Sequence, residues 1–163
     1  MAKEGGALEL AVVKPGAVLG PVMGRDFSPS IEIVKKLLRR ELPACPRLGF
    51  PLVDVRDIAD LLLAEPILLV YGGERFLGAG DFSWMADIAR VLKERLGARA
   101  ARVPTGVLPD WLLRLLAAFD PVTRSVVFEV GVERPVSAAK AKQVLGWAPR
   151  SNDEAIVATA ESL

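Results

Sequence analysis

The sequence contains no histidine and only one cysteine among its 163 residues. Without histidine, neither a Ser-His-Asp triad nor a Cys-His pair can form, and the commonest zinc ligand is missing, so we predict no metal site. With Cys45 as the one cysteine, no disulfide can form within the chain, which favours a reducing compartment and a cytoplasmic location. Cys45 lies between two prolines in LPACPRLGF, without an activating neighbour, and we interpret it as a loop thiol with no catalytic role.

The chain also lacks an excess of either charge. Its 21 basic and 20 acidic residues give a net charge of +1, so the strongly basic face of a nucleic-acid-binding protein is not expected. A local basic cluster does exist at Lys35, Lys36, Arg39 and Arg40. It is interpreted as the solvated face of a helix, and the alternative is a phosphate-binding tract.

No long uninterrupted apolar run is present. The richest apolar stretch, Ile58–Tyr71, is broken by Asp60, Glu65 and Pro66, and a membrane helix needs about 20 apolar residues. The opening MAKEGG lacks the apolar region of a signal peptide. We therefore expect no membrane association. Hydrophobic residues nevertheless make up 52% of the chain, and this surplus favours a partner or a homo-oligomer.

Strands and helices are expected to alternate along the chain. The apolar run Leu8–Val13, followed by Lys14-Pro15, is typical of a strand that is buried on both faces and ends there. Ser28 and Pro29 supply an N-cap and a first-turn proline for a helix to about Leu42. The other expected elements are strands at Phe50–Val55 and Arg75–Ala79, a short helix capped by Asp57 and ending near Glu65, helices at Ser83–Leu96, Pro109–Phe119 and Ser137–Leu145, a less regular helical stretch at Val122–Val130, a β-prone run at Pro66–Tyr71, and a terminal helix opened by the capping box Ser151–Glu154.

Four segments carry a resemblance to a known family. They are VVKPGAVLGP at 12–21, VDVRDIADLL at 53–62, ERFLGAGDFSWMADIARVL at 74–92, and PVSAAKAKQVLGWAPRSNDEAI at 135–156. In this order and spacing they resemble the carboxyl-terminal half of the extended short-chain dehydrogenase/reductases, in the NAD-dependent epimerase/dehydratase and dihydroflavonol-reductase-like group. The resemblance implies an α/β fold, with a partial Rossmann-type parallel sheet, flanking helices and a small substrate-binding lobe. We expect one domain over residues 1–163.

The first segment is where the resemblance places the nicotinamide end of NAD or NADP. It implies that Pro15, Gly16 and Val18 bind the cofactor through the backbone. Proline fixes a turn and glycine lets a flat ring approach the main chain, so the residue types suit this function. The alternative is an ordinary strand-ending turn. Because the value of Gly16 is expected to lie in ring approach and not in packing, we predict that Gly16→Val costs this chain little stability but abolishes cofactor use when the full enzyme is reconstituted.

Substrate contacts are expected in two loops, at 20–29 and 46–50. The candidate residues are Gly20, Arg25, Phe27, Arg47 and Phe50. The phenylalanines would form an apolar wall, and the arginines would orient an anionic or hydroxylated small-molecule substrate. The alternative is ordinary loop packing with solvated arginines.

The second and fourth segments contain residues that we interpret as structural. Asp54 and Asp57 could be a catalytic pair of carboxylates, but a strand that enters a helix needs a cap, and aspartate is suited to it. Arg56 is expected to join the same local hydrogen bonds. Trp147 is predicted to lie in the core.

The sequence departs from complete members of the family in two ways. Gly16, Gly20 and Gly24 do not have the G-x-x-G-x-x-G spacing of a phosphate-binding loop. The one tyrosine, Tyr71, is followed four residues later by Arg75, so the catalytic Tyr-x-x-x-Lys is also lacking. We therefore expect no catalytic residue in this chain, no tight dinucleotide binding and no activity on its own.

Two functional hypotheses follow. In the first, the chain is the substrate-binding, carboxyl-terminal portion of an NAD(P)-dependent reductase or epimerase whose dinucleotide-binding half is missing. In the second, it is a non-catalytic binding or interaction module derived from that family. Both leave an apolar strand edge at Leu8–Val13, which is expected to pair with the missing half or with a second copy of the chain.

Overall fold

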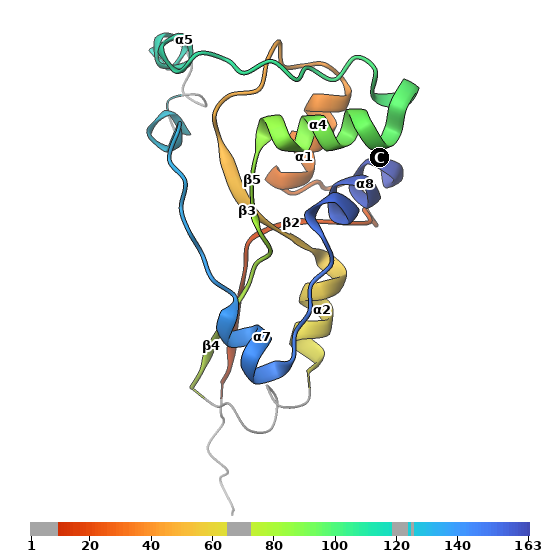
Figure 1. Cartoon of the computed structure of the whole chain (residues 1–163), viewed down its shortest axis with the longest axis vertical. Helices are drawn as coiled ribbons and strands as arrows, with labels where there is room; N and C mark the ends of the chain where they lie inside the picture. Colours follow the sequence, from red (N-terminus) through yellow and green to blue (C-terminus); the bar gives the residue numbers. More distant parts are fainter. Residues whose placement is uncertain (1–9, 65–72, 119–123, 125) are drawn as a thin grey trace, which may run out of the picture.

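The computed structural model describes residues 10–64, 73–118, 124 and 126–163. They form an elongated α/β molecule in which two small sheets follow one another along the long axis (Figure 1). The first sheet pairs two strands in parallel, β1 (Val12–Pro15) with β4 (Arg75–Gly78). The second has the order β2 (Ala17–Leu19), β3 (Gly49–Asp54) and β5 (Phe82–Trp84), with β2 parallel and β5 antiparallel to β3. The expected fold class, with its partial parallel sheet, is confirmed.

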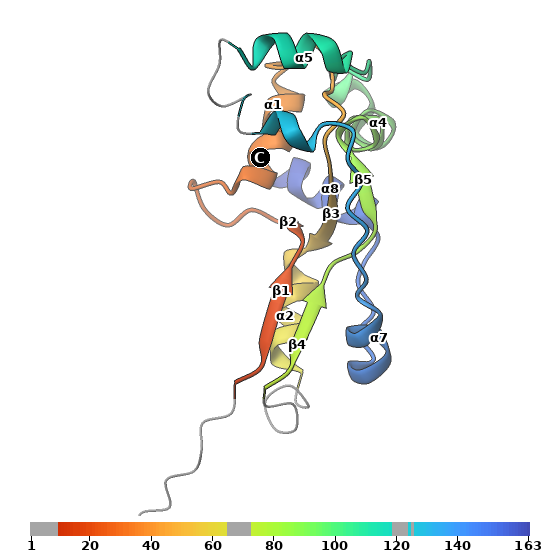
Figure 2. The ribbon, with the colours of Figure 1, turned by 90° about the vertical axis from the view of Figure 1, so that its left-hand side faces the viewer.

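Two stretches of chain contribute to both sheets, as Figure 2 shows. β1 passes into β2 through Gly16 alone, and β4 leads to β5 through residues 79–81. The Gly16 N–H donates to the Gly78 carbonyl (2.9 Å), so the first sheet is held together up to the point where the chain changes sheets. The strand β5 was not expected from the sequence, and its pairing with β3 delays the following helix to Met85.

The predicted end of the first strand at Lys14-Pro15 is wrong. Both residues belong to β1, where they are exposed, so the expected burial on both faces is wrong as well. Proline is tolerated in this strand because, among the described residues, β1 pairs on one side only and the missing N–H faces its open edge. Leu8, where we expected the strand to begin, lies outside the described residues.

Six α-helices and two short 3₁₀ helices lie among the described residues. They are α1 (Pro29–Leu38), α2 (Val55–Leu63), α4 (Met85–Leu96), α5 (Asp110–Leu116), α7 (Ala139–Leu145), α8 (Asn152–Ser162), η1 (Gly97–Ala100) and η2 (Val127–Glu129). Their positions follow the sequence expectations, with shifted ends. Of the helical stretch expected at Val122–Val130, the structure describes the short helix η2. Phe119 and the β-prone run Pro66–Tyr71 lie outside the described residues.

Helix α1 ends four residues before the expected Leu42. Arg40 adopts the left-handed conformation (φ 55°), and its N–H donates to the Leu37 carbonyl. The N–H of Glu41 then donates to the Lys36 carbonyl (3.0 Å), which completes a Schellman motif. Because glycine normally occupies the left-handed position, an arginine there gave no signal in the sequence.

Helix α2 begins earlier than expected because Asp54, not Asp57, is its N-cap. The Asp54 carboxylate accepts a hydrogen bond from the Arg56 N–H (2.9 Å). Asp57 lies in the first turn instead. At the start of α8, Ser151 accepts from the Glu154 N–H as the sequence predicts.

Two apolar cores lie on either side of the point where β1 passes into β2. The larger lies between the second sheet and helices α1, α4 and α8, and includes Leu37, Leu52, Ile88, Leu92 and Ile156. The smaller lies between the first sheet and helices α2 and α7, and includes Val53, Leu61, Phe76, Ala141 and Trp147. Trp147 is therefore a core residue, as predicted. No described helix is long and apolar enough to cross a membrane.

Candidate functional site

A pocket of about 390 Å³ opens where the chain passes from β1 to β2. It lies against the start of α1 and is lined by Gly16, Ala17, Val18, Ser28, Pro29, Ser30, Ile33 and Phe50. We call it the Gly16 pocket. Two strands and the first turn of a helix build its walls, so its shape is set by regular elements. Its lining is mainly apolar, with two hydroxyl groups, as is common for small-molecule sites.

Three of the predicted site residues meet in this pocket. Gly16 and Val18 come from the junction of β1 with β2, and Phe50 comes from the neighbouring strand β3. Pro15 directly precedes Gly16, at the end of β1. Two of the three residues proposed for the cofactor, Gly16 and Val18, therefore share one cavity with Phe50, proposed for the substrate.

The polar groups of the pocket form a short chain of hydrogen bonds. The Ser30 hydroxyl donates to the Val18 carbonyl, and the Ser28 and Ser30 hydroxyl oxygens lie 3.0 Å apart. Because Ser30 uses its one proton on Val18, Ser28 is the donor in the second bond. In an extended strand the N–H and C=O of one residue point to the same side, so the Val18 N–H also faces α1 and not β3.

The structure gives Gly16 a packing function that the sequence did not reveal. A Cβ at this position would lie 3.2 Å from the Pro51 carbonyl carbon, closer still to its oxygen, and 3.4 Å from the Ala79 Cβ. Strand β3 passes too close to admit any side chain. Our expectation that Gly16→Val costs little stability is therefore wrong. Glycine is needed here for backbone packing, whatever else it does.

The other four predicted substrate residues lie away from the Gly16 pocket. Phe27 lines a different pocket on the far side of α1, where the Lys35 ammonium lies 4.3 Å from its ring centroid. Arg47 pairs with Asp110 (3.0 Å), and Arg25 is exposed. Gly20 ends β2 with φ +118°, a conformation that favours glycine, and donates its N–H to the buried Thr159 hydroxyl (2.7 Å).

Asp54 lies beside Gly20 and is buried, with its carboxylate bound by Arg56. The guanidinium donates from Nε to Oδ1 (2.9 Å) and from Nη2 to Oδ2 (2.7 Å). Burial raises the pKa of Asp54, but the hydrogen bonds and the charge of Arg56 outweigh it and lower this pKa below its usual value. The Asp54 carboxylate is therefore held ionised and fully engaged, as a structural residue would be.

We expect Asp54→Asn to lower the free energy of unfolding by about 1 kcal/mol at pH 7, because the cap acceptor survives while the ion pair with a partly exposed arginine is lost. Since the folded pKa of Asp54 is lowered, this contribution is complete above the unfolded value of about 3.9 and disappears as the pH falls through the folded value. Urea denaturation of both proteins between pH 7 and pH 3 measures it. A difference that stays constant down to pH 3 would contradict the assignment.

Asp57 joins α2 to the segment between α7 and α8. Its carboxylate accepts from the Arg150 N–H (2.8 Å) and from the Arg150 guanidinium, and its backbone carbonyl accepts from Trp147 Nε1 (2.9 Å). Both carboxylates of the candidate pair thus have structural partners. They do not line the Gly16 pocket.

Cys45 is buried and paired through its backbone. Its N–H donates to the Gly106 carbonyl (2.8 Å), and its thiol lies 3.2 Å from the Pro104 carbonyl oxygen. Burial raises the pKa of the thiol, which disfavours the reactive thiolate. Among the described residues no cluster of potential metal ligands is found.

No protein-family model and no curated protein matches the sequence. Solved structures do match. A nucleoside-diphosphate-sugar epimerase from Pseudomonas aeruginosa is 21% identical, with a TM-score of 0.73 over 95% of this chain and 48% of that chain. This chain has the fold of part of that enzyme. The resemblance seen in the four sequence segments is thus confirmed at the level of the fold.

Two further structures agree. Yeast methylglyoxal/isovaleraldehyde reductase Gre2, complexed with NADPH, is 23% identical, with a TM-score of 0.67 over 94% of this chain and 42% of that chain. UDP-glucose 4-epimerase from Thermotoga maritima, with UDP-glucose, is 22% identical, with a TM-score of 0.65 over 95% of this chain and 46% of that chain. The chain spans less than half the length of each of these three proteins.

Sequence reasoning did not single out five of the eight lining residues as site residues: Ala17, Ser28, Pro29, Ser30 and Ile33. Ser28 occupies the N-cap position of α1, as predicted, but its side chain bonds to Ser30 and makes no cap hydrogen bond. Ser30 and Ile33 gave no signal, because a serine and an isoleucine in an amphipathic helix are ordinary. A signal could have come from the helical period, since positions 30 and 33 lie on one face of α1.

Proposed function

We propose that this chain forms the substrate-binding and nicotinamide-side part of an NAD(P)-dependent reductase or epimerase acting on a small molecule. The observation that carries the proposal is the Gly16 pocket. There, Gly16 and Val18 meet Phe50, which comes from a different strand, β3. The bound dinucleotide would supply hydride exchange with a carbonyl or alcohol carbon. This chain would hold the reacting groups in place and exclude water.

The lining of the Gly16 pocket suits a flat ring that carries a carboxamide. The Val18 N–H faces the cavity side of β2 and can donate to the carboxamide oxygen, while the Ser28 oxygen, whose proton is donated to Ser30, can accept from the carboxamide N–H. Ile33 and Phe50 provide apolar walls for the ring and for an apolar part of the substrate. Choice between NAD and NADP does not depend on these residues.

The open edge of the first sheet is the observation that supports a second proposal, that β1 pairs with a strand of another polypeptide. Two strands make a sheet too small for independent stability, and β1 has one strand neighbour among the described residues. Its exposed side includes Lys14 and Pro15, and Leu10 just before it is 67% exposed. We propose that this edge pairs with a strand of a dinucleotide-binding half, and that a second copy of this chain competes for the same edge.

We expect the 163-residue polypeptide alone to bind NADH or NADPH no more tightly than about 1 mM and to reduce no carbonyl substrate. The reason is that its sequence lacks a glycine-rich loop for the pyrophosphate and a Tyr-x-x-x-Lys pair for proton transfer. Titration calorimetry with each dinucleotide measures this. A micromolar dissociation constant would refute it.

The function itself is tested by adding a dinucleotide-binding half that contains both motifs, such as that of the yeast reductase, and measuring NADPH oxidation with aldehyde substrates. Turnover that appears on mixing supports the proposal. Phe50→Ala should then raise KM about tenfold, whereas Phe128→Ala, at a side chain 66% exposed, should not. Light scattering shows whether the halves associate. Association without turnover, with a small molecule still bound, would favour the non-catalytic module instead.

A further inference from the structure

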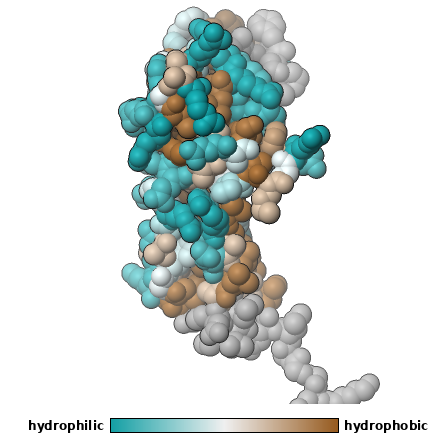
Figure 3. Space-filling model, turned by 90° about the vertical axis from the view of Figure 1, so that its right-hand side faces the viewer, coloured by the Kyte–Doolittle hydropathy of each residue, from teal (hydrophilic) through white to brown (hydrophobic). Residues whose placement is uncertain are grey.

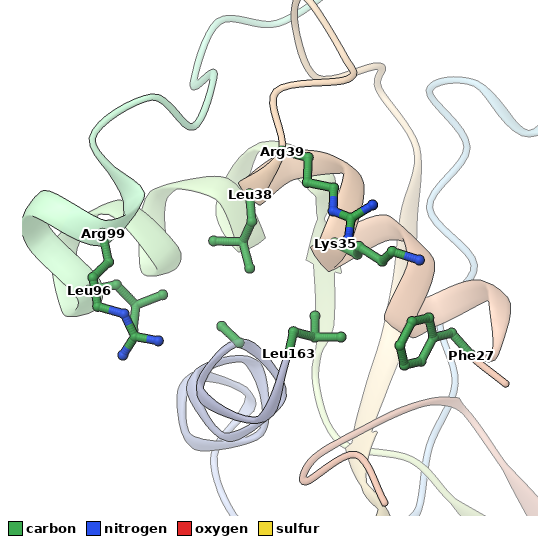
Figure 4. A pocket seen from close by; sticks show the side chains of 8 residues that line it. Phe27, Lys35, Leu38, Arg39, Leu96, Arg99 and Leu163 are labelled. Atoms are coloured by element: carbon green, nitrogen blue, oxygen red, sulfur yellow. The ribbon is translucent and has the colours of Figure 1, made fainter. Parts of the chain in front are cut away.

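A second pocket, of about 270 Å³, lies between helices on the opposite side of α1 from the Gly16 pocket (Figure 4). We call it the interhelical pocket. Its floor is apolar and consists of Leu38 from α1, Leu96 from α4, and Ala160 and Leu163 from α8 and the residue after it. Phe27, from the loop before α1, closes one end. On the face shown in Figure 3, hydrophilic residues are interspersed with several apolar patches along the length of the molecule.

Three cationic side chains surround this apolar floor. Lys35 and Arg39 come from α1, and Arg99 comes from η1 on the other side of the pocket (Figure 4). Among the described residues, neither Arg39 nor Arg99 takes part in an ion pair, so both guanidinium groups have donors to offer. Lys35 is held in place by Glu32 (2.8 Å) and by the ring of Phe27. Of the basic cluster in the sequence, Lys36 and Arg40 are exposed and do not line this pocket.

The charged side chains that line the pocket are all cationic, and no acidic side chain is found among its described lining residues. Two carboxylates lie beside them: the main-chain carboxylate of Leu163 in the 163-residue chain, and Glu32, which pairs with Lys35. The pKa of Glu32 is lowered, first by the hydrogen bond from Lys35 and further by the charges of Lys35, Lys36 and Arg39. The cations therefore exceed their local counter-charges. An apolar floor under unpaired guanidinium groups matches a ligand that is apolar at one end and anionic at the other.

We propose that the interhelical pocket binds a single-chain amphipathic anion, with its apolar chain over Leu38, Leu96 and Leu163 and its carboxylate or phosphate bound at the edge of this floor by the guanidinium of Arg39 or of Arg99. Arginine is well suited to both head groups because its planar guanidinium offers paired donors. The pocket shares no lining residue with the Gly16 pocket. The proposal is thus independent of the proposed function, and either can fail without the other.

The test is titration calorimetry of the 163-residue chain at low ionic strength with sodium decanoate and with decyl phosphate, each below its micelle-forming concentration. We expect one-to-one binding of at least one of them, and which one binds better identifies the head group. Decanol, acetate and inorganic phosphate, which carry only the chain or only the charge, should bind at least about tenfold more weakly. If neither amphipathic anion binds, or if decanol binds as tightly, the proposal is wrong.

Substitutions place the site. The double variant Arg39→Gln/Arg99→Gln should weaken binding at least about tenfold, because it removes both charged donors. The matched control Lys36→Gln/Arg102→Gln removes the same charge from exposed neighbours that do not line the pocket, and should leave affinity within about twofold. All four side chains are exposed, so thermal unfolding should stay unchanged. Equal loss of binding in both variants would show non-specific charge attraction and overturn the proposal.

Discussion

Replacing Gly16 with valine is expected to lower the free energy of unfolding by about 3 kcal/mol or more. The Cβ of any side chain at this position would overlap the backbone carbonyl of Pro51 in β3, and backbone cannot move aside as a flexible side chain can. The strain would fall where β1 passes into β2, so both sheets would be disturbed. Urea denaturation followed by circular dichroism measures the change.

Gly24→Val is the matched control, because nothing lies within 4 Å of a Cβ at Gly24. It should change stability by no more than about 0.5 kcal/mol. Gly16→Ala should also be destabilising, since the overlap comes from the Cβ itself. If the Gly16→Val protein is as stable as the Gly24→Val protein, β3 can move away from the new side chain. Close approach of a cofactor ring would then be the better explanation for a glycine at this position.

The elements of this fold could largely be predicted from local signals. Ser151 caps α8 and Trp147 lies in the core, because caps and buried apolar residues are properties of short segments. The parallel pairing of β1 with β4 agrees with the partial parallel sheet that the family resemblance implied. The errors arose where distant contacts decide. Phe82–Trp84 forms a strand because it pairs with β3. After α1, Arg40 adopts a left-handed conformation that arginine does not favour and that its residue type therefore did not predict.

The candidate site could be predicted only in part. Gly16, Val18 and Phe50 meet because the β2–β3 pairing brings them together, and the family resemblance pointed to those strands. Arg25 and Arg47 were predicted as substrate residues because they are arginines in loops. The residue types of a loop do not determine the direction in which its side chains point. Arg47 pairs with Asp110, and Phe27 lies in the interhelical pocket with Ala160 and Leu163. Such choices are made by tertiary contacts that no short motif encodes.

Trp147 contributes the largest side chain to the core beneath the first sheet. Trp147 is 7% exposed, packs with Phe76 of β4 and Leu61 of α2, and donates from Nε1 to the Asp57 carbonyl (2.9 Å). It therefore links the segment before α8 to both layers that support the open strand edge. Loss of this side chain would leave a cavity and remove the indole hydrogen bond to the Asp57 carbonyl at once.

We expect Trp147→Ala to lower the free energy of unfolding by about 3–5 kcal/mol, the usual cost of deleting a buried tryptophan. Trp147→Phe, which keeps most of the volume but cannot donate to the Asp57 carbonyl, should cost about 1 kcal/mol through the lost hydrogen bond and somewhat more through packing. Trp111→Ala is the control: that side chain is 68% exposed, and its loss should change stability by no more than about 0.5 kcal/mol. Thermal and urea unfolding of the three variants test this order. Equal effects of the two alanine substitutions would mean that the first sheet does not rest on Trp147, and the pairing of β1 with β4 would then need another source of stability.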